Sequence, residues 1–160
     1  TRRIARGTYQ LLITTPNVLA WSNADVEFAD FLLEVDTAHL GGPLDNEFGV
    51  VFRYVDDDNY YLFTISSDGY YRLQKQVDGE WESILGWLSS EAINVGEGSD
   101  NHITILAEGS QFIFLVNDVL LEQIEDDTFD SGGIGLAAGT FDEGDVEIAF
   151  DNLQVWELEP

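Results

Sequence analysis

The sequence predicts an all-β protein, a two-sheet antiparallel jelly-roll β-sandwich, and three observations lead to this prediction. Apolar and polar residues alternate with a period of two along most of the chain, as in strands with one buried face. Clusters of Asp, Asn, Gly and Ser separate the alternating segments. No window of ordinary helix length shows the i, i+3, i+4, i+7 spacing of an amphipathic helix.

About eleven strands are expected from these signals, at the spacing typical of sandwiches and jelly rolls. They are Tyr9–Thr14, Phe31–Ala38, Phe48–Val55, Tyr60–Ser66, Tyr70–Val77, Glu82–Leu85, His102–Glu108, Gln111–Val116, Val119–Ile124, Gly133–Gly139 and Val146–Trp156.

Two turns fix the pairing of neighbouring strands. Asn117-Asp118 has the length and residue types of a two-residue type I′ hairpin loop, because Asn and Asp tolerate positive φ. A three-residue loop at 67–69 would place Ile65 opposite Tyr71 and Phe63 opposite Leu73. If the next loop places Phe52 opposite Phe63, one face forms the inter-sheet core, made of Phe48, Val50, Phe52, Tyr54, Tyr61, Phe63, Ile65, Tyr71 and Leu73.

The composition limits the expected number of domains and the kinds of binding partner. With 160 residues, the chain is expected to be one domain, 1–160, excised from a larger protein that carries other domains. The net charge of −25 argues against binding to nucleic acid and against adsorption or insertion at an anionic membrane. It would attract divalent cations instead. The chain has no Cys, so no disulfide or thiolate metal site is possible.

The outer face of the central strands carries the candidate ligand site. By the expected register, two of the six basic residues lie together there among Tyr rings. Guanidinium groups beside aromatic rings suit sugar hydroxyls, carboxylates or sulfates, although each arginine could instead pair with a neighbouring acid. The candidate ligand-binding residues are Arg53, Arg72, Gln74, Tyr60, Tyr70 and Trp87.

Several acidic turns offer oxygen ligands of the kind that Ca²⁺ prefers, though none has the spacing of an EF-hand. Solvated acidic turns are the simpler interpretation. The alternative is one structural Ca²⁺ that ties the last strand to the first part of the chain, with Asp151 and Asp30 as its ligands.

Five segments together resemble the concanavalin A-like lectin/glucanase superfamily. They are FADFLLEVD (28–36), FGVVFRYVDDDNYYLFTIS (48–66), GYYRLQKQVDGEW (69–81), VNDVLL (116–121) and SGGIGLAAGTF with VEIAFDNLQV (131–141, 146–155). Within it, they are most similar to the laminin-G-like and 3-keto-disaccharide-hydrolase-type domains of bacterial envelope and secreted proteins. The resemblance implies a jelly roll with Arg53 on its concave sheet, and Asp151 near a calcium position.

The same resemblance bears on activity. Family 16 glucanases carry a Glu-x-Asp-x-(x)-Glu strand, and this chain has Glu34 and Asp36 but Ala38 or His39 where the last Glu would stand. We therefore expect no catalytic residues in that strand. The favoured hypothesis is a non-catalytic, extracytoplasmic, carbohydrate-binding module of a larger bacterial surface or sensor protein. A glycoside or keto-sugar hydrolase, and a structural or protein-binding spacer, are the alternatives.

Overall fold

The computed structural model describes residues 3–6 and 9–159 and is built from β-strands throughout. Its strands are β1 (Arg3–Arg6), β2 (Tyr9–Ile13), β3 (Leu19–Phe28), β4 (Phe31–Gly41), β5 (Asn46–Asp56), β6 (Asn59–Ile65), β7 (Tyr70–Val77), β8 (Glu80–Ser89), β9 (Asp100–Glu108), β10 (Gln111–Val116), β11 (Val119–Glu125), β12 (Gly132–Thr140) and β13 (Val146–Glu157). Within these ranges, no helix is long and apolar enough to cross a membrane.

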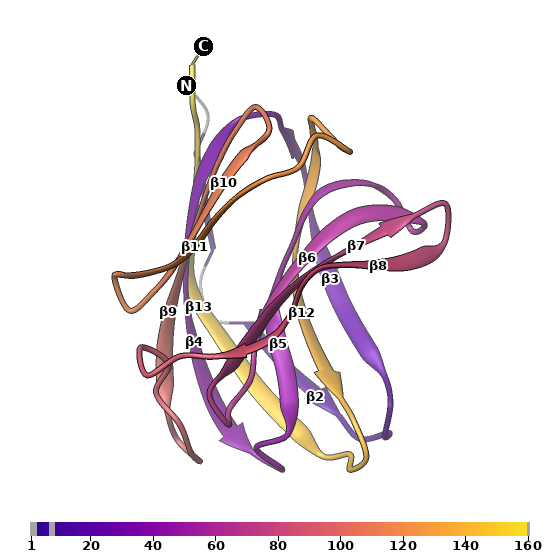
Figure 1. The fold of residues 1–160 in the computed structure, drawn as a ribbon. Coiled ribbons are helices and arrows are strands. Elements are labelled where there is room, and N and C mark those ends of the chain that lie inside the picture. The colour runs from indigo at the N-terminus through magenta and orange to yellow at the C-terminus, as the bar shows by residue number, and fades with distance from the viewer. Residues whose placement is uncertain (1–2, 7–8, 160) are drawn as a thin grey trace.

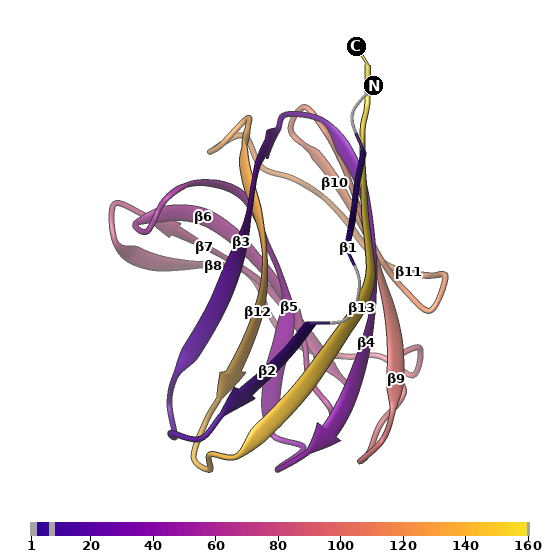
Figure 2. The same ribbon diagram turned by 180° about the vertical axis from the view of Figure 1, so that it is seen from behind.

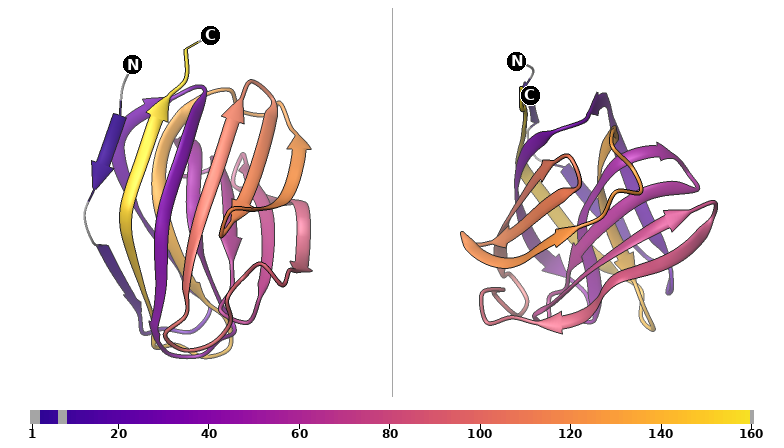
Figure 3. Two further views of the ribbon diagram at one scale, coloured as in Figure 1. Left: turned by 90° about the vertical axis from the view of Figure 1, so that its left-hand side faces the viewer. Right: turned by 45° about the horizontal axis from the view of Figure 1, so that its top comes forward.

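The strands form two antiparallel sheets that pack face to face (Figure 1). The seven-stranded sheet has the order β1-β13-β4-β9-β10-β11, and β2 also pairs with β13; Figure 3 (left) looks onto this sheet. The six-stranded sheet has the order β3-β12-β5-β6-β7-β8. Seen from behind in Figure 2, β1 and β2 follow one another along the same edge of β13. The predicted two-sheet jelly roll is confirmed.

Aromatic rings from both sheets meet in the core. Phe52 of the six-stranded sheet stacks on Tyr61, with centroids 5.1 Å apart, and meets the ring of Phe112 edge-on across the interface at 5.3 Å. Phe63 stacks on Phe114 of the opposite sheet at 4.4 Å. Such pairs add about 0.5 to 1.5 kcal/mol each to the free energy of burying the rings.

The predicted turns are largely confirmed. Asn117 and Asp118 have φ values of 53° and 65°, as a type I′ loop requires. Across the 67–69 loop, Ile65 pairs with Tyr71 and Phe63 pairs with Leu73. The pairing one strand earlier is shifted by two residues, because Phe52 lies opposite Tyr61 rather than Phe63. A shift of two leaves the same side chains on the same face.

Strand β5 ends in a bulge, and the bulge changes which side chains point inward. The register between β5 and β6 breaks between Phe52 and Asp56, and Arg53 has a φ of 48°. One extra residue in a strand reverses the alternation beyond it. Arg53 therefore turns toward the interior, and Tyr54 contacts Trp21 and Tyr60 on the outer face. The prediction that Tyr54 belongs to the inter-sheet core is wrong.

Two strands were not expected, and one is longer than expected. β1 and β3 have no counterpart among the predicted strands, since β3 carries Ser22, Asn23 and Asp25 in its middle, which are turn-forming residue types. β8 extends from Glu80 to Ser89, whereas only Glu82–Leu85 was predicted. Most residues of β8 are exposed, because it is an edge strand.

Candidate functional site

The outer face of the six-stranded sheet, the side turned away from the seven-stranded sheet, is unusually well covered for an outer surface. Tyr60 and Leu62 point to this side of β6, yet they are only 2% and 0% exposed. Trp21 of β3 lies 5.1 Å from the Tyr60 ring, and Trp81 of β8 meets it edge-on at 5.9 Å. Aromatic side chains from the two edge strands thus converge over the middle of the sheet and enclose a second, smaller apolar cluster.

A groove of about 330 Å³ lies on this face, and we call it the outer groove. It is lined by residues of β3, β5, β7, β8 and β12, of the segment that precedes β3, and by the residue that follows β12. The lining residues with polar groups or rings are Asn17, Glu47, Arg72, Gln74, Trp81, Thr140 and Phe141.

A paired arginine and glutamate form the polar centre of the outer groove. The Arg72 guanidinium donates a hydrogen bond to the carboxylate of Glu47, which is buried. Burial raises the pKa of Glu47, and the charge and hydrogen bond of Arg72 oppose that rise. Gly139 makes room for the pair, since a Cβ there would lie 2.9 Å from the Cγ of Glu47.

Arg72 is also held by aromatic rings. Its guanidinium carbon lies 4.3 Å from the Trp87 ring centroid and 5.8 Å from that of Phe141. These are cation–π distances, and they fix the orientation of the side chain. The Nε of Arg72 and the hydroxyl of Thr64, which faces Arg72 across the strand pair, are buried without a hydrogen-bond partner among the described residues.

Gln74 supplies a free polar group in the outer groove. Its side chain is half-buried beside Arg72 on β7, and its amide makes no hydrogen bond to any residue in the described ranges. An amide offers both a donor and an acceptor, which is what a vicinal pair of hydroxyls requires.

The predicted ligand-binding residues do not all lie in one site. Arg72 and Gln74 line the outer groove, while Tyr70 and Trp87 line a neighbouring hollow that shares Phe141 with it. Tyr60 lies on the expected face, but the tryptophans cover it, and burial raises the pKa of its hydroxyl to about 12.

Sequence reasoning missed Glu47, Phe141 and the groove position of Trp81. The alternation of β5 does put Glu47 on the same face as Gly49, so that residue was open to prediction. Phe141 follows the end of β12 and carries no comparable local signal.

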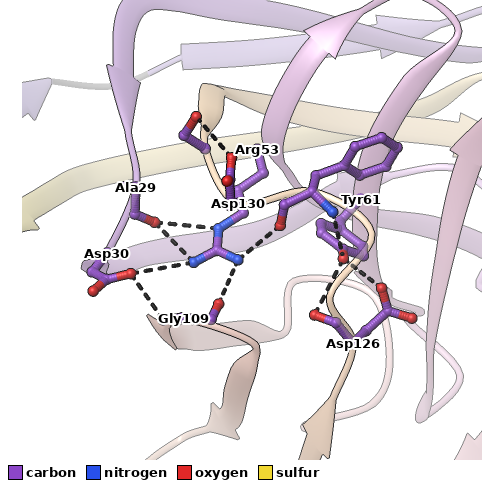
Figure 4. A network of polar contacts seen from close by, with 9 residues as sticks. Ala29, Asp30, Arg53, Tyr61, Gly109, Asp126 and Asp130 are labelled. Carbon is purple, nitrogen blue, oxygen red and sulfur yellow. Dashed lines mark hydrogen bonds and ion pairs between the residues drawn. The ribbon is translucent and has the colours of Figure 1, made fainter.

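The prediction that Arg53 belongs to the outer face is wrong. Its side chain is 0% exposed and its guanidinium donates to three backbone carbonyls, those of Ala29 (3.0 Å), Gly109 (2.6 Å) and Phe129 (2.9 Å) (Figure 4). Asp30 lies 3.5 Å away. Burial lowers the pKa of Arg53, and nearby charges, including Asp30, oppose that shift. The bulge in β5 explains the error, because it turns this residue inward.

The two predicted calcium ligands do not lie together. Asp151 pairs with Asp36 in the register of β13 against β4, whereas Asp30 precedes the first residue of β4. Six residues of strand separate Asp36 from Asp30, which is roughly 20 Å. Asp30 already accepts hydrogen bonds from the Gly109 amide and from Arg53. The described residues include no cluster of three or more His, Cys, Asp or Glu that could hold a metal.

Glu34 and Asp36, the acids of the glucanase-like strand, lie on the outer face of the seven-stranded sheet. Both hold His102 of β9: Asp36 Oδ1 is 2.6 Å from Nδ1, and Glu34 Oε1 is 3.2 Å from Nε2. With a carboxylate at each ring nitrogen, the imidazolium is the form that satisfies both contacts. Burial lowers the pKa of His102, but the hydrogen bonds to Asp36 and Glu34 outweigh it, so the net shift is upward.

Comparison with known proteins supports the fold. No family model matches the chain. A carbohydrate-binding module, CBM66 from Bacillus subtilis, superposes with a TM-score of 0.73 at 19% identity, over 95% of this chain and 94% of that one. Sheep galectin-11, solved with glycerol, gives 0.60 at 16% identity, over 89% and 98%. A putative glycosyl hydrolase from Parabacteroides distasonis gives 0.66 at 19% identity, over 95% and 87%.

One curated protein matches in sequence. A TPR repeat-containing protein of Treponema pallidum is 31% identical over 88 residues, which is 53% of this chain. The match spans only 10% of that protein's length. At these levels of identity, the solved structures show the fold alone, and it is the two-sheet jelly roll that the sequence predicted.

Proposed function

We propose that this concanavalin A-like jelly-roll domain is a non-catalytic module that binds carbohydrate in the outer groove. The observation that carries the proposal is the grouping of an oriented Arg72–Glu47 pair, a free Gln74 amide and the ring of Trp81 in one groove. Two of the structurally similar proteins are, by their descriptions, a carbohydrate-binding module and a galectin.

The chemistry of the groove suits a sugar. Hydroxyl groups both donate and accept, and the groove offers a guanidinium donor, a carboxylate acceptor and an amide that does both. An exposed indole such as Trp81, which is 46% exposed, provides an apolar face for the CH groups of a pyranose ring. Because Glu47 neutralises Arg72 and the protein is strongly acidic, a neutral glycan fits better than an anionic one.

Binding is favoured over hydrolysis by the acids of the groove. Glycoside hydrolysis ordinarily requires two carboxylates about 5 to 10 Å apart across the sugar. Glu47 is the only carboxylate among the described residues that line the groove, and it forms an ion pair with Arg72.

The test is calorimetric titration with a panel of neutral oligosaccharides. Gln74→Leu and Trp81→Leu should each weaken binding about tenfold, or about 1.4 kcal/mol. Gln123→Leu, the same substitution at an exposed position of β11 on the other sheet, is the matched control and should leave binding unchanged. Absence of saccharide binding with and without CaCl₂ would remove the lectin function and leave a structural spacer.

The same proposal places the domain outside the cytoplasm, in a larger surface or sensor protein. The acidic composition and the resemblance to envelope and secreted domains support this placement. Fractionation of the source cells, with an antibody against this domain, tests it; signal confined to the cytosol would contradict it. A structural Ca²⁺ stays a prediction, and a melting temperature that rises in millimolar CaCl₂ but not in MgCl₂ would support it.

A further inference from the structure

A second hollow, beside the outer groove, combines aromatic rings with unpaired carboxylates. It has a volume of about 220 Å³ and is lined by the rings of Tyr70, Trp87 and Phe141, by the carboxylates of Asp45 and Asp68, and by Asn46 and Ser66. We call it the aromatic hollow. Asp45 directly precedes β5, while Asp68 and Tyr70 lie at the loop between β6 and β7.

The acids at the aromatic hollow lack basic partners. Neither Asp45 nor Asp68 forms an ion pair with any residue in the described parts of the chain. Burial and the nearby charges of Asp68, Asp142 and Glu143 raise the pKa of Asp45, which shows how strongly negative this corner is. Arg72 lies over the Trp87 and Phe141 rings, but its charge is paired with Glu47. A cation in the hollow would relieve the repulsion between the acids, whereas an anion would add to it.

The rings select the kind of cation. Tyr70 is 42% exposed and Trp87 is 37% exposed, and Trp87 meets Phe141 edge-on at 6.1 Å. Faces of aromatic rings attract ammonium groups, and cages of such rings recognise alkylated ammonium ions. A metal ion such as Ca²⁺ needs six to eight oxygen ligands. The described lining offers two carboxylates and the side chains of Asn46 and Ser66, which are already hydrogen-bonded to neighbouring residues.

We propose that the aromatic hollow binds an alkylammonium group, either a quaternary one, as in choline, or the protonated amine of an amino sugar. The inference goes beyond sugar binding in the outer groove and does not depend on it. The two sites share Phe141, so a glycan that carries a positively charged substituent could occupy both.

The test uses the 160-residue chain and four small probes, followed by the NMR signals of the Trp87 indole and the Tyr70 ring. Choline is compared with its uncharged isostere 3,3-dimethyl-1-butanol, and glucosamine is compared with glucose. Each cation should bind at least tenfold more tightly than its neutral partner, and added NaCl should weaken binding. Choline alone, glucosamine alone or both together would support the proposal, and they distinguish the two sources of the charge.

Variants test whether the cation binds in the aromatic hollow rather than elsewhere on the acidic surface. Asp45→Asn and Tyr70→Leu should each weaken cation binding by about three- to tenfold. Asp127→Asn, at an exposed position of the loop after β11, removes the same charge elsewhere and should have no effect. Gln74→Leu should weaken sugar binding without changing cation binding, so failure of one site is distinguishable from failure of the other.

Three results would overturn the inference. Equal affinity for a cation and its neutral isostere would show that charge is not recognised. Unchanged binding in Asp45→Asn would show that the carboxylates are not involved. Saturation of the Trp87 and Tyr70 signals by CaCl₂, with no response to choline or glucosamine, would make the hollow a metal site.

Discussion

Replacing Arg53 by Met tests whether its buried guanidinium holds the sandwich together. Its three carbonyl acceptors come from different parts of the chain: Ala29 in the loop between β3 and β4, Gly109 between β9 and β10, and Phe129 before β12. The side chain therefore links the two sheets at one end of the molecule (Figure 4).

The magnitude follows from the number of bonds lost. A hydrogen bond to a charged group contributes about 1.5 to 3 kcal/mol to the free energy of unfolding. Because Ala29 and Gly109 are exposed residues, water can reach their carbonyls in the variant, and we take about 1 kcal/mol for each of the three carbonyls that lose the guanidinium. Arg53→Met should therefore lose about 3 kcal/mol, equivalent to about 6 to 12 °C in melting temperature for a domain of this size.

Urea unfolding followed by tryptophan fluorescence measures this loss. Arg53→Lys is the matched variant, since it keeps the charge and most of the side chain but has fewer donors. It should lose about half as much free energy. If Arg53→Met unfolds within 0.5 kcal/mol of the wild type, the link between the sheets does not depend on the guanidinium and the reasoning is refuted.

Three further variants test other features. Thr64→Val should leave the free energy of unfolding unchanged or raise it by about 1 kcal/mol, because it removes a buried hydroxyl without a partner; a loss above 1 kcal/mol in urea would contradict this. Folding raises the pKa of His102, so its contribution to the free energy of unfolding is full below the unfolded pKa of about 6.5 and declines as pH rises through the folded value. His102→Gln should remove this decline from a series of unfolding curves measured at different pH. Gly49→Ala should lower the melting temperature or prevent folding, because its Cβ would lie 2.0 Å from the carbonyl oxygen of Phe63, whereas Gly86→Ala, with open space, should have little effect.

Local spacing was enough to predict the hairpins. The loop lengths at 67–69 and 117–118 fixed which residues pair across them, and a period of two then assigned their faces. Arg72 and Gln74 were placed correctly on the outer face for this reason.

The bulge at Arg53 could not be predicted in the same way. Positive φ values usually fall on Gly or Asn, so an arginine in the sequence does not indicate a bulge with positive φ. Its partner strand provides the only clue: a Cβ on Gly132 would lie 2.4 Å from the Arg53 carbonyl carbon, and this close approach is visible only once the strands are paired. Two arginines that seemed to share one face therefore have separate roles.

Strand β13 lies inside the seven-stranded sheet, with β4 on one side and both β1 and β2 on the other. The earliest strands therefore have no hydrogen-bonded neighbour until nearly the whole domain has left the ribosome. Pairings between such distant segments form slowly. Until β13 is synthesised and pairs, β2 and the open edge of β4 are therefore exposed to other proteins. Deleting β13 would remove a pairing partner from β1, β2 and β4 at once and should yield an aggregating chain rather than a smaller folded one.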